Sequence, residues 1–145
     1  MEKKDLKPAG VFKYFEEICQ VPRPSKKEEK MIAYLKAFGA KHNLETKVDE
    51  AGNVLIKKPA TPGKENLQTV VLQSHIDMVC EKNNDVQHDF LTDPIETEID
   101  GEWLKAKGTT LGADNGIGVA TELAILADDL SLIHISEPTR RVVIS

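Results

Sequence analysis

Residues 69–77 decide the fold, and they read Thr69-Val70-Val71-Leu72-Gln73-Ser74-His75-Ile76-Asp77. The first five are rich in β-branched and apolar residues, which predicts a buried strand. Side chains alternate across a strand, so His75 and Asp77 point the same way at its C-terminal end. Open α/β sheets bind ligands at that end, and imidazole is a common zinc ligand whose ring is often held by a nearby carboxylate. The stretch therefore predicts half of a metal site.

A second motif, Gly112-Ala113-Asp114-Asn115-Gly116, stands just before a helical pattern of apolar residues that runs from 117 to 126. It predicts a tight turn that carries Asp114 to the start of a helix, where backbone N–H groups are free. Each motif also has a simpler interpretation. His75 and Asp77 can form an ordinary hydrogen bond at a strand end, and the glycine-flanked motif can be an Asx turn that caps a helix. The presence of both motifs, each at a strand-to-loop transition, favours the metal site.

The composition indicates one soluble globular domain. The chain has 145 residues, of which 30% are charged and 40% hydrophobic, and its net charge is −5. This acidic balance argues against nucleic acid or an anionic membrane as a partner. The charged N-terminus contains no apolar run typical of a signal peptide, so we expect a cytoplasmic location. Two cysteines, Cys19 and Cys80, are too few and too far apart for a disulfide framework, and we expect reduced thiols.

Periodicity predicts the remaining elements. A helix over residues 11–19 must end by Val21-Pro22, and a second helix begins at Ser25, which forms a capping box with Glu28. Residues 44–49 and 53–57 predict one β-hairpin, placed beside the strand at 69–73. Residues 95–99 and 103–106 predict another, with Asp100-Gly101 as its turn.

Several segments together resemble a known family, the co-catalytic zinc metallopeptidases, in the branch of the aminoacyl-histidine (Xaa-His) dipeptidases, or cytosol non-specific dipeptidases. The resemblance covers about residues 5 to 129 and is carried by residues 11–15, 21–25, 52–53, 72–82 and 109–118. It implies an α/β fold, namely the N-terminal part of a three-layer α/β/α catalytic domain with a mixed sheet.

The resemblance also implies the chemistry. His75 binds one zinc ion, Asp114 bridges two, and Asp77 acts in catalysis by orienting His75 without contacting metal. Manganese or cobalt also suits such mixed N/O ligation. The implied substrates are short peptides such as Xaa-His, and the implied full-length protein is a homodimer. An alternative is a non-catalytic, truncated paralogue that acts as a binding module. A related metal-dependent amidohydrolase or deacetylase is a further alternative.

The family also needs a Glu-Glu pair about thirty residues after the bridging aspartate, a later Asp and a late His, and this sequence has none of them. Residues 130–145 look like the translation of a sequencing adapter, so we expect residues 1–129 to be authentic and 130–145 to be a non-native tail. A native strand over 130–135 is the alternative. We therefore expect a truncated chain that binds zinc weakly, does not hydrolyse peptides, exposes apolar surface and has marginal stability.

Overall fold

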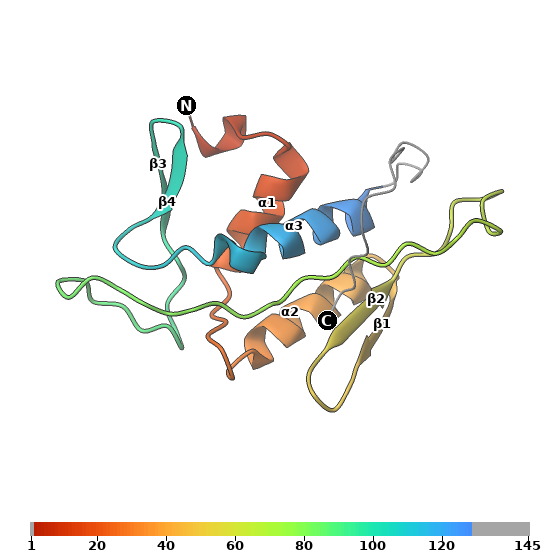
Figure 1. Ribbon diagram of the computed structural model, residues 1–145, viewed down its shortest axis with the longest axis horizontal. Coiled ribbons are helices and arrows are strands. Elements are labelled where there is room, and N and C mark those ends of the chain that lie inside the picture. Colours follow the sequence, from red (N-terminus) through yellow and green to blue (C-terminus); the bar gives the residue numbers. More distant parts are fainter. Residues whose placement is uncertain (1, 129–145) are drawn as a thin grey trace.

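The computed structural model describes residues 2–128, and the predicted tail at 130–145 lies outside them. The described part forms three α-helices, a short 3₁₀ helix and two β-hairpins (Figure 1). In chain order the elements are η1 (Lys3–Asp5), α1 (Ala9–Cys19), α2 (Glu29–Lys41), β1 (Glu45–Val48), β2 (Val54–Lys57), β3 (Thr97–Asp100), β4 (Trp103–Ala106) and α3 (Ala113–Ala127).

Helices α1 and α3 lie side by side (Figure 1). They pack closely at Gly10, where an added Cβ would lie 3.6 Å from the Cβ of Ala124. Helix α1 buries Phe15, Ile18 and Cys19, which recur at the three- and four-residue spacing of a helical face. The prediction of this helix, and of its end before Val21-Pro22, is confirmed.

Helix α2 starts later than predicted. It begins at Glu29 rather than at Ser25, and no side chain caps its first turn. The predicted capping box is wrong because both of its members have other partners. Glu28 Oε1 accepts the N–H of Lys26 at 2.6 Å, and the hydroxyl of Ser25 donates to Asp77.

The two hairpins are confirmed. Strands β1 and β2 pair antiparallel with Glu45 opposite Lys57, and β3 and β4 pair antiparallel with Thr97 opposite Ala106. Gly101 supplies the positive φ of 61° that the tight turn between β3 and β4 requires.

The strand predicted at 69–73 is wrong for the described part of the chain. This segment runs as extended backbone between α2 and α3 (Figure 1), and it is outside both two-stranded sheets. Val70 is 73% exposed and Val71 is 42% exposed. A buried strand needs hydrogen-bonded neighbours along its edges, and no segment within residues 2–128 provides one here. The segment nevertheless delivers a buried Ser74 and, after it, His75.

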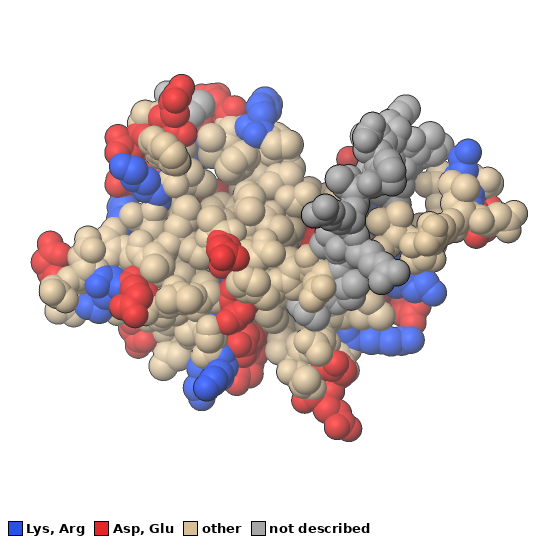
Figure 2. All heavy atoms as spheres, viewed as in Figure 1, with Lys and Arg blue, Asp and Glu red and all other residues tan. Residues whose placement is uncertain are grey.

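The core is built from the inner faces of the helices, β2, Met78 and Ile95. Its most buried members include Phe15, Ile18, Met31, Val54 and Leu123, each at most 2% exposed. The expected exposed apolar surface is present, since Leu67, Val79 and Trp103 are each more than 65% exposed, in addition to Val70. Acidic and basic side chains are interspersed on the face seen in Figure 2. None of the helices in residues 2–128 has the length and apolar character needed to cross a membrane.

Candidate functional site

The imidazole of His75 lies between two carboxylates. Its Nδ1 is 3.0 Å from Asp77 Oδ1, and its Nε2 is 3.0 Å from Asp114 Oδ1. Asp77 belongs to the extended segment, whereas Asp114 belongs to the first turn of α3. The structure thus brings together all three residues that the sequence singled out.

Asp77 is engaged through both of its oxygens. Oδ1 faces His75, and Oδ2 accepts the hydroxyl of Ser25. The hydrogen bond from Ser25 holds the pKa of the Asp77 carboxyl below its usual range; partial burial opposes this shift, and His75 adds to it. Asp77 therefore stays an ionised acceptor beside the ring. Sequence reasoning missed the role of Ser25 because its partner is 52 positions away.

The ring of His75 is about half exposed, at 51%. Partial burial lowers its pKa, but hydrogen bonds to Asp114 and to Asp77 outweigh this effect, so the pKa is raised above the ordinary value. In the neutral ring, an N–H on Nδ1 donated to Asp77 leaves the lone pair on Nε2. The hydrogen bond to Asp114 therefore belongs to the protonated ring, in which Nε2–H donates to Asp114 Oδ1.

The turn at Asp114 leaves its side chain exposed to solvent. Gly112 has a φ of 70°, and Asp114 and Asn115 have non-helical backbone angles although they lie within α3. The side chain that caps the following helix is Asn115, whose Oδ1 accepts the N–H of Gly118 at 3.1 Å. The Asx-type cap considered for this motif is therefore present, but it uses Asn115. Asp114 is left with a side chain that is 96% exposed.

Arg23 is a buried residue of the site region that sequence reasoning missed. The residue is 2% exposed, and it lies in the connection between α1 and α2. The guanidinium donates to the carbonyls of Ile76 at 3.3 Å, Asp77 at 3.4 Å and Gly112 at 2.8 Å. One side chain therefore contacts both the His75 segment and the Asp114 turn. Apart from its place in the segment 21–25 that carries the family resemblance, its one signal in the sequence is that it stands between Pro22 and Pro24.

A second buried contact joins the His75 segment to α3. Ser74 Oγ donates to Glu122 Oε2 at 2.7 Å, and both residues are buried. Burial raises the pKa of the Glu122 carboxyl, and the hydrogen bond from Ser74 acts in the opposite direction. This contact fixes the segment along the helix whose first turn carries Asp114.

The ligating atoms of His75 and Asp114, an imidazole nitrogen and a carboxylate oxygen, suit a divalent metal ion. An imidazole nitrogen and a carboxylate oxygen converge at 3.0 Å on an exposed edge, and such mixed N/O ligation suits zinc, manganese or cobalt. Within residues 2–128 no group of three His, Cys, Asp or Glu side chains is arranged to hold a metal. The described part of the chain thus offers two converging ligands rather than a complete coordination shell.

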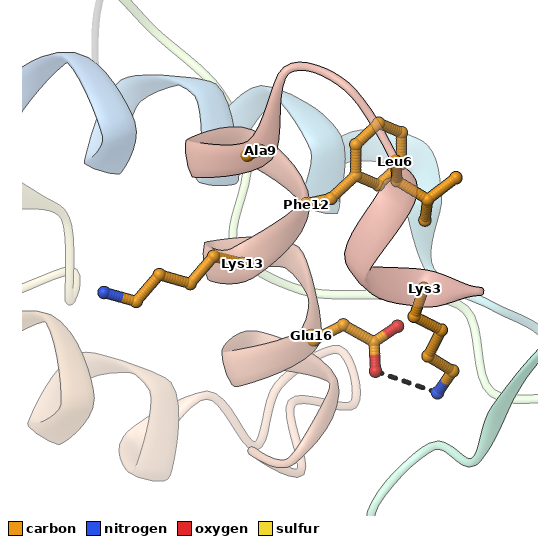
Figure 3. Close-up of a pocket in the computed structure, with 6 residues that line it drawn as sticks. All are labelled: Lys3, Leu6, Ala9, Phe12, Lys13 and Glu16. Atoms are coloured by element: carbon orange, nitrogen blue, oxygen red, sulfur yellow. Dashed lines mark hydrogen bonds and ion pairs between the residues drawn. The ribbon is translucent and has the colours of Figure 1, made fainter.

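A shallow cavity of about 220 Å³ lies elsewhere, between η1 and α1. Figure 3 shows Leu6 and Phe12 along it and the ion pair between Lys3 and Glu16 at one end, with Nζ and Oε2 3.0 Å apart. None of the three site residues lines this cavity.

No family model matches the chain. Individual proteins and solved structures do match it, and they agree with one another. The cytosol non-specific dipeptidase of Escherichia coli (strain K12) is 50% identical over 133 residues, which is 92% of this chain and 27% of that protein. The crystal structure of aminoacylhistidine dipeptidase from Vibrio alginolyticus superposes with a TM-score of 0.84 at 54% identity, over 88% of this chain and 26% of that one.

More distant structures share the fold. A tripeptidase from Staphylococcus aureus has a TM-score of 0.65 at 21% identity, and covers 81% of this chain and 31% of its own. The aminopeptidase PepT from Bacillus cereus has the same TM-score at 22% identity, with the same coverage. These matches confirm the predicted fold class, an α/β peptidase catalytic domain. The chain spans about a quarter of the length of the dipeptidases it matches. With half or more of its aligned residues identical to theirs, the chain is similar over most of its length to about a quarter of an aminoacylhistidine dipeptidase and of a cytosol non-specific dipeptidase.

Proposed function

We propose that this chain supplies part of the active site of a metal-dependent dipeptidase. That enzyme hydrolyses short peptides such as Xaa-His in the cytoplasm. The observation that carries the proposal is the imidazole of His75 held between Asp77 on Nδ1 and Asp114 on Nε2. The relatives named as dipeptidases support the substrate class.

The three residues have separate roles in this proposal. His75 offers the Nε2 lone pair, and Asp114 offers a carboxylate able to bridge two ions. Asp77 accepts the Nδ1–H of His75 and so fixes the ring orientation. The hydroxyl of Ser25 donates to the other carboxylate oxygen of Asp77 and so orients Asp77. A pair of zinc ions bound there would supply Lewis acidity, which polarises the scissile carbonyl and lowers the pKa of bound water.

The remaining ligands and the general base lie outside residues 2–128 in this proposal. The described residues hold no cluster of three ligands, whereas a catalytic zinc ion has three protein ligands as a rule. The 145-residue chain by itself is therefore expected to bind zinc weakly and to leave dipeptides intact.

Calorimetric titration of the metal-free chain with Zn²⁺ tests the site. We expect His75→Ala and Asp114→Ala to abolish binding, and Asp77→Asn to weaken it by about 10- to 100-fold, the usual effect of losing a residue that orients a ligand. Asp100→Asn is the matched control, because this exposed carboxylate pairs with Lys105 on the β3–β4 hairpin. Equal zinc affinity in the wild type and in His75→Ala contradicts the proposal.

The substrate class is tested on the full-length protein, by comparing dipeptides with N-acyl amino acids. Faster hydrolysis of dipeptides is expected. A clear preference for N-acyl amino acids would instead assign the protein to the amidohydrolases or deacetylases.

A further inference from the structure

Arg23 holds the two halves of the site together. Its guanidinium reaches the carbonyls of Ile76 and Asp77 on one side and the carbonyl of Gly112 on the other. Its backbone carbonyl accepts the N–H of Met78 at 3.0 Å, and Pro24 forms an isolated parallel bridge with Met78. Arg23 thus contacts the chain directly beyond His75 with both main chain and side chain.

The glycines around Asp114 leave room for this guanidinium. A Cβ added at Gly112 or at Gly116 would lie 2.7 Å from Arg23 Nη2 in either case. The guanidinium therefore fills the space between the two glycines that flank Asp114. Because Arg23 is 2% exposed, it cannot yield to a side chain there without losing its carbonyl partners.

The geometry also explains why the residue is an arginine. A planar guanidinium presents N–H groups in a fixed fork, so Nη1 and Nη2 can serve two different segments at once. Lysine carries the same charge on one nitrogen at the end of a flexible stem and cannot hold both sets of carbonyls in this geometry. Within the described residues, all of the hydrogen-bond acceptors of this guanidinium are backbone carbonyls, whose positions are those of the chain itself.

We propose that Arg23 is a positioning residue that sets the separation between His75 Nε2 and Asp114 Oδ1. Its use in metal binding rests on the function proposed above, but its effect on the two side chains does not need a metal.

The experiment compares variants of the 145-residue chain by two measurements. Nuclear Overhauser contacts between the ring protons of His75 and the β protons of Asp114 report the separation in the metal-free chain. Calorimetric titration with Zn²⁺ reports the consequence for binding. For Arg23→Lys we expect the contacts to disappear and zinc affinity to fall by about 10-fold or more. Gly116→Ala, whose new Cβ would lie 2.7 Å from Arg23 Nη2 and 3.1 Å from Phe15 Cε2, is expected to displace the guanidinium and to act in the same way.

Two controls separate positioning from general stability. Gly10→Ala makes the same change in α1, where the new Cβ would meet Ala124 at an ordinary 3.6 Å. Val54→Ala removes buried methyl groups from β2 and lowers stability away from the site. Both controls are expected to keep the contacts and the zinc affinity.

The proposal is overturned if Arg23→Lys keeps both the contacts and the affinity, or if Val54→Ala loses them equally. If the wild type binds no zinc while the contacts respond as expected, the proposed metal site is wrong and the positioning role of Arg23 stands.

Discussion

At the scale of single residues, Glu122 is a carboxyl group buried next to the segment that carries His75. It is 6% exposed, and its only side-chain hydrogen bond among the described residues comes from Ser74. Burial raises its pKa above the ordinary value of 4.5, against the effect of Ser74. The folded state therefore binds this proton more tightly than the unfolded chain does. The resulting stabilisation is complete below pH 4.5 and is lost as the pH rises through the folded pKa.

Glu122→Gln should remove this pH dependence, since glutamine keeps an acceptor for Ser74 and does not titrate. We expect the wild type to lose stability relative to the variant above pH 4.5, by about 1.4 kcal/mol for each pH unit over which the folded and unfolded states differ in protonation. Urea unfolding across this range measures the difference, with exposed Glu50→Gln as the control. Parallel pH profiles for wild type and Glu122→Gln would contradict the assignment.

Residues whose partners are close in sequence could be predicted, and those with distant partners could not. His75 and Asp77 are two apart, so strand geometry alone pairs them, and the glycines around Asp114 indicate its turn. The spacing of Ser25 and Glu28 predicts a helix cap, yet the hydroxyl of Ser25 donates to Asp77. Arg23 gave no local signal, because its acceptors are backbone carbonyls from two other segments.

At the scale of elements, the contact between α2 and β1 depends on a glycine. A Cβ at Gly39 would lie 1.9 Å from Thr46 Oγ1, so there is no space for it. Gly39→Ala should destabilise the chain by about 1–3 kcal/mol, as overpacking usually does, although alanine favours helix by about 1 kcal/mol. Gly10→Ala, whose Cβ would meet Ala124 at an ordinary van der Waals distance of 3.6 Å, should be neutral or stabilising by up to about 1 kcal/mol.

Chemical denaturation of both variants checks this pair, and Thr46→Ala in the Gly39→Ala background should recover part of the loss. Equal stability of Gly39→Ala and Gly10→Ala would show that α2 and β1 do not pack as closely as described. The helices themselves could be predicted because their periodicity is local. The packing of α2 on β1 could not, because sequence spacing says nothing of how close two elements approach.

At the scale of the whole molecule, the described residues leave an unpaired extended segment beside the helices. The β-branched run at 69–73 predicts a strand, but pairing is a property of neighbours, and both sheets of the described part are two-stranded hairpins formed elsewhere. The chain also spans only about a quarter of the length of its dipeptidase relatives. Strand propensity without a pairing partner thus accounts for the valines exposed at this segment.

Two valine substitutions with the same chemistry distinguish an unpaired segment from a buried strand. Val70 is 73% exposed, whereas Val54 in β2 is 1% exposed. Valine and threonine are nearly isosteric, so Val→Thr mainly replaces one methyl group with a hydroxyl. A hydroxyl buried without a hydrogen-bond partner costs about 1–3 kcal/mol. We expect Val54→Thr to lose stability by that amount and Val70→Thr to stay within about 0.5 kcal/mol of wild type.

Val70→Thr should also reduce aggregation, because it removes apolar surface from an exposed extended segment. Urea unfolding and light scattering measure the two effects. A loss at Val70 as large as that at Val54 would mean that residues 69–73 are buried in solution, through pairing with a second copy of the chain or with residues outside the described range.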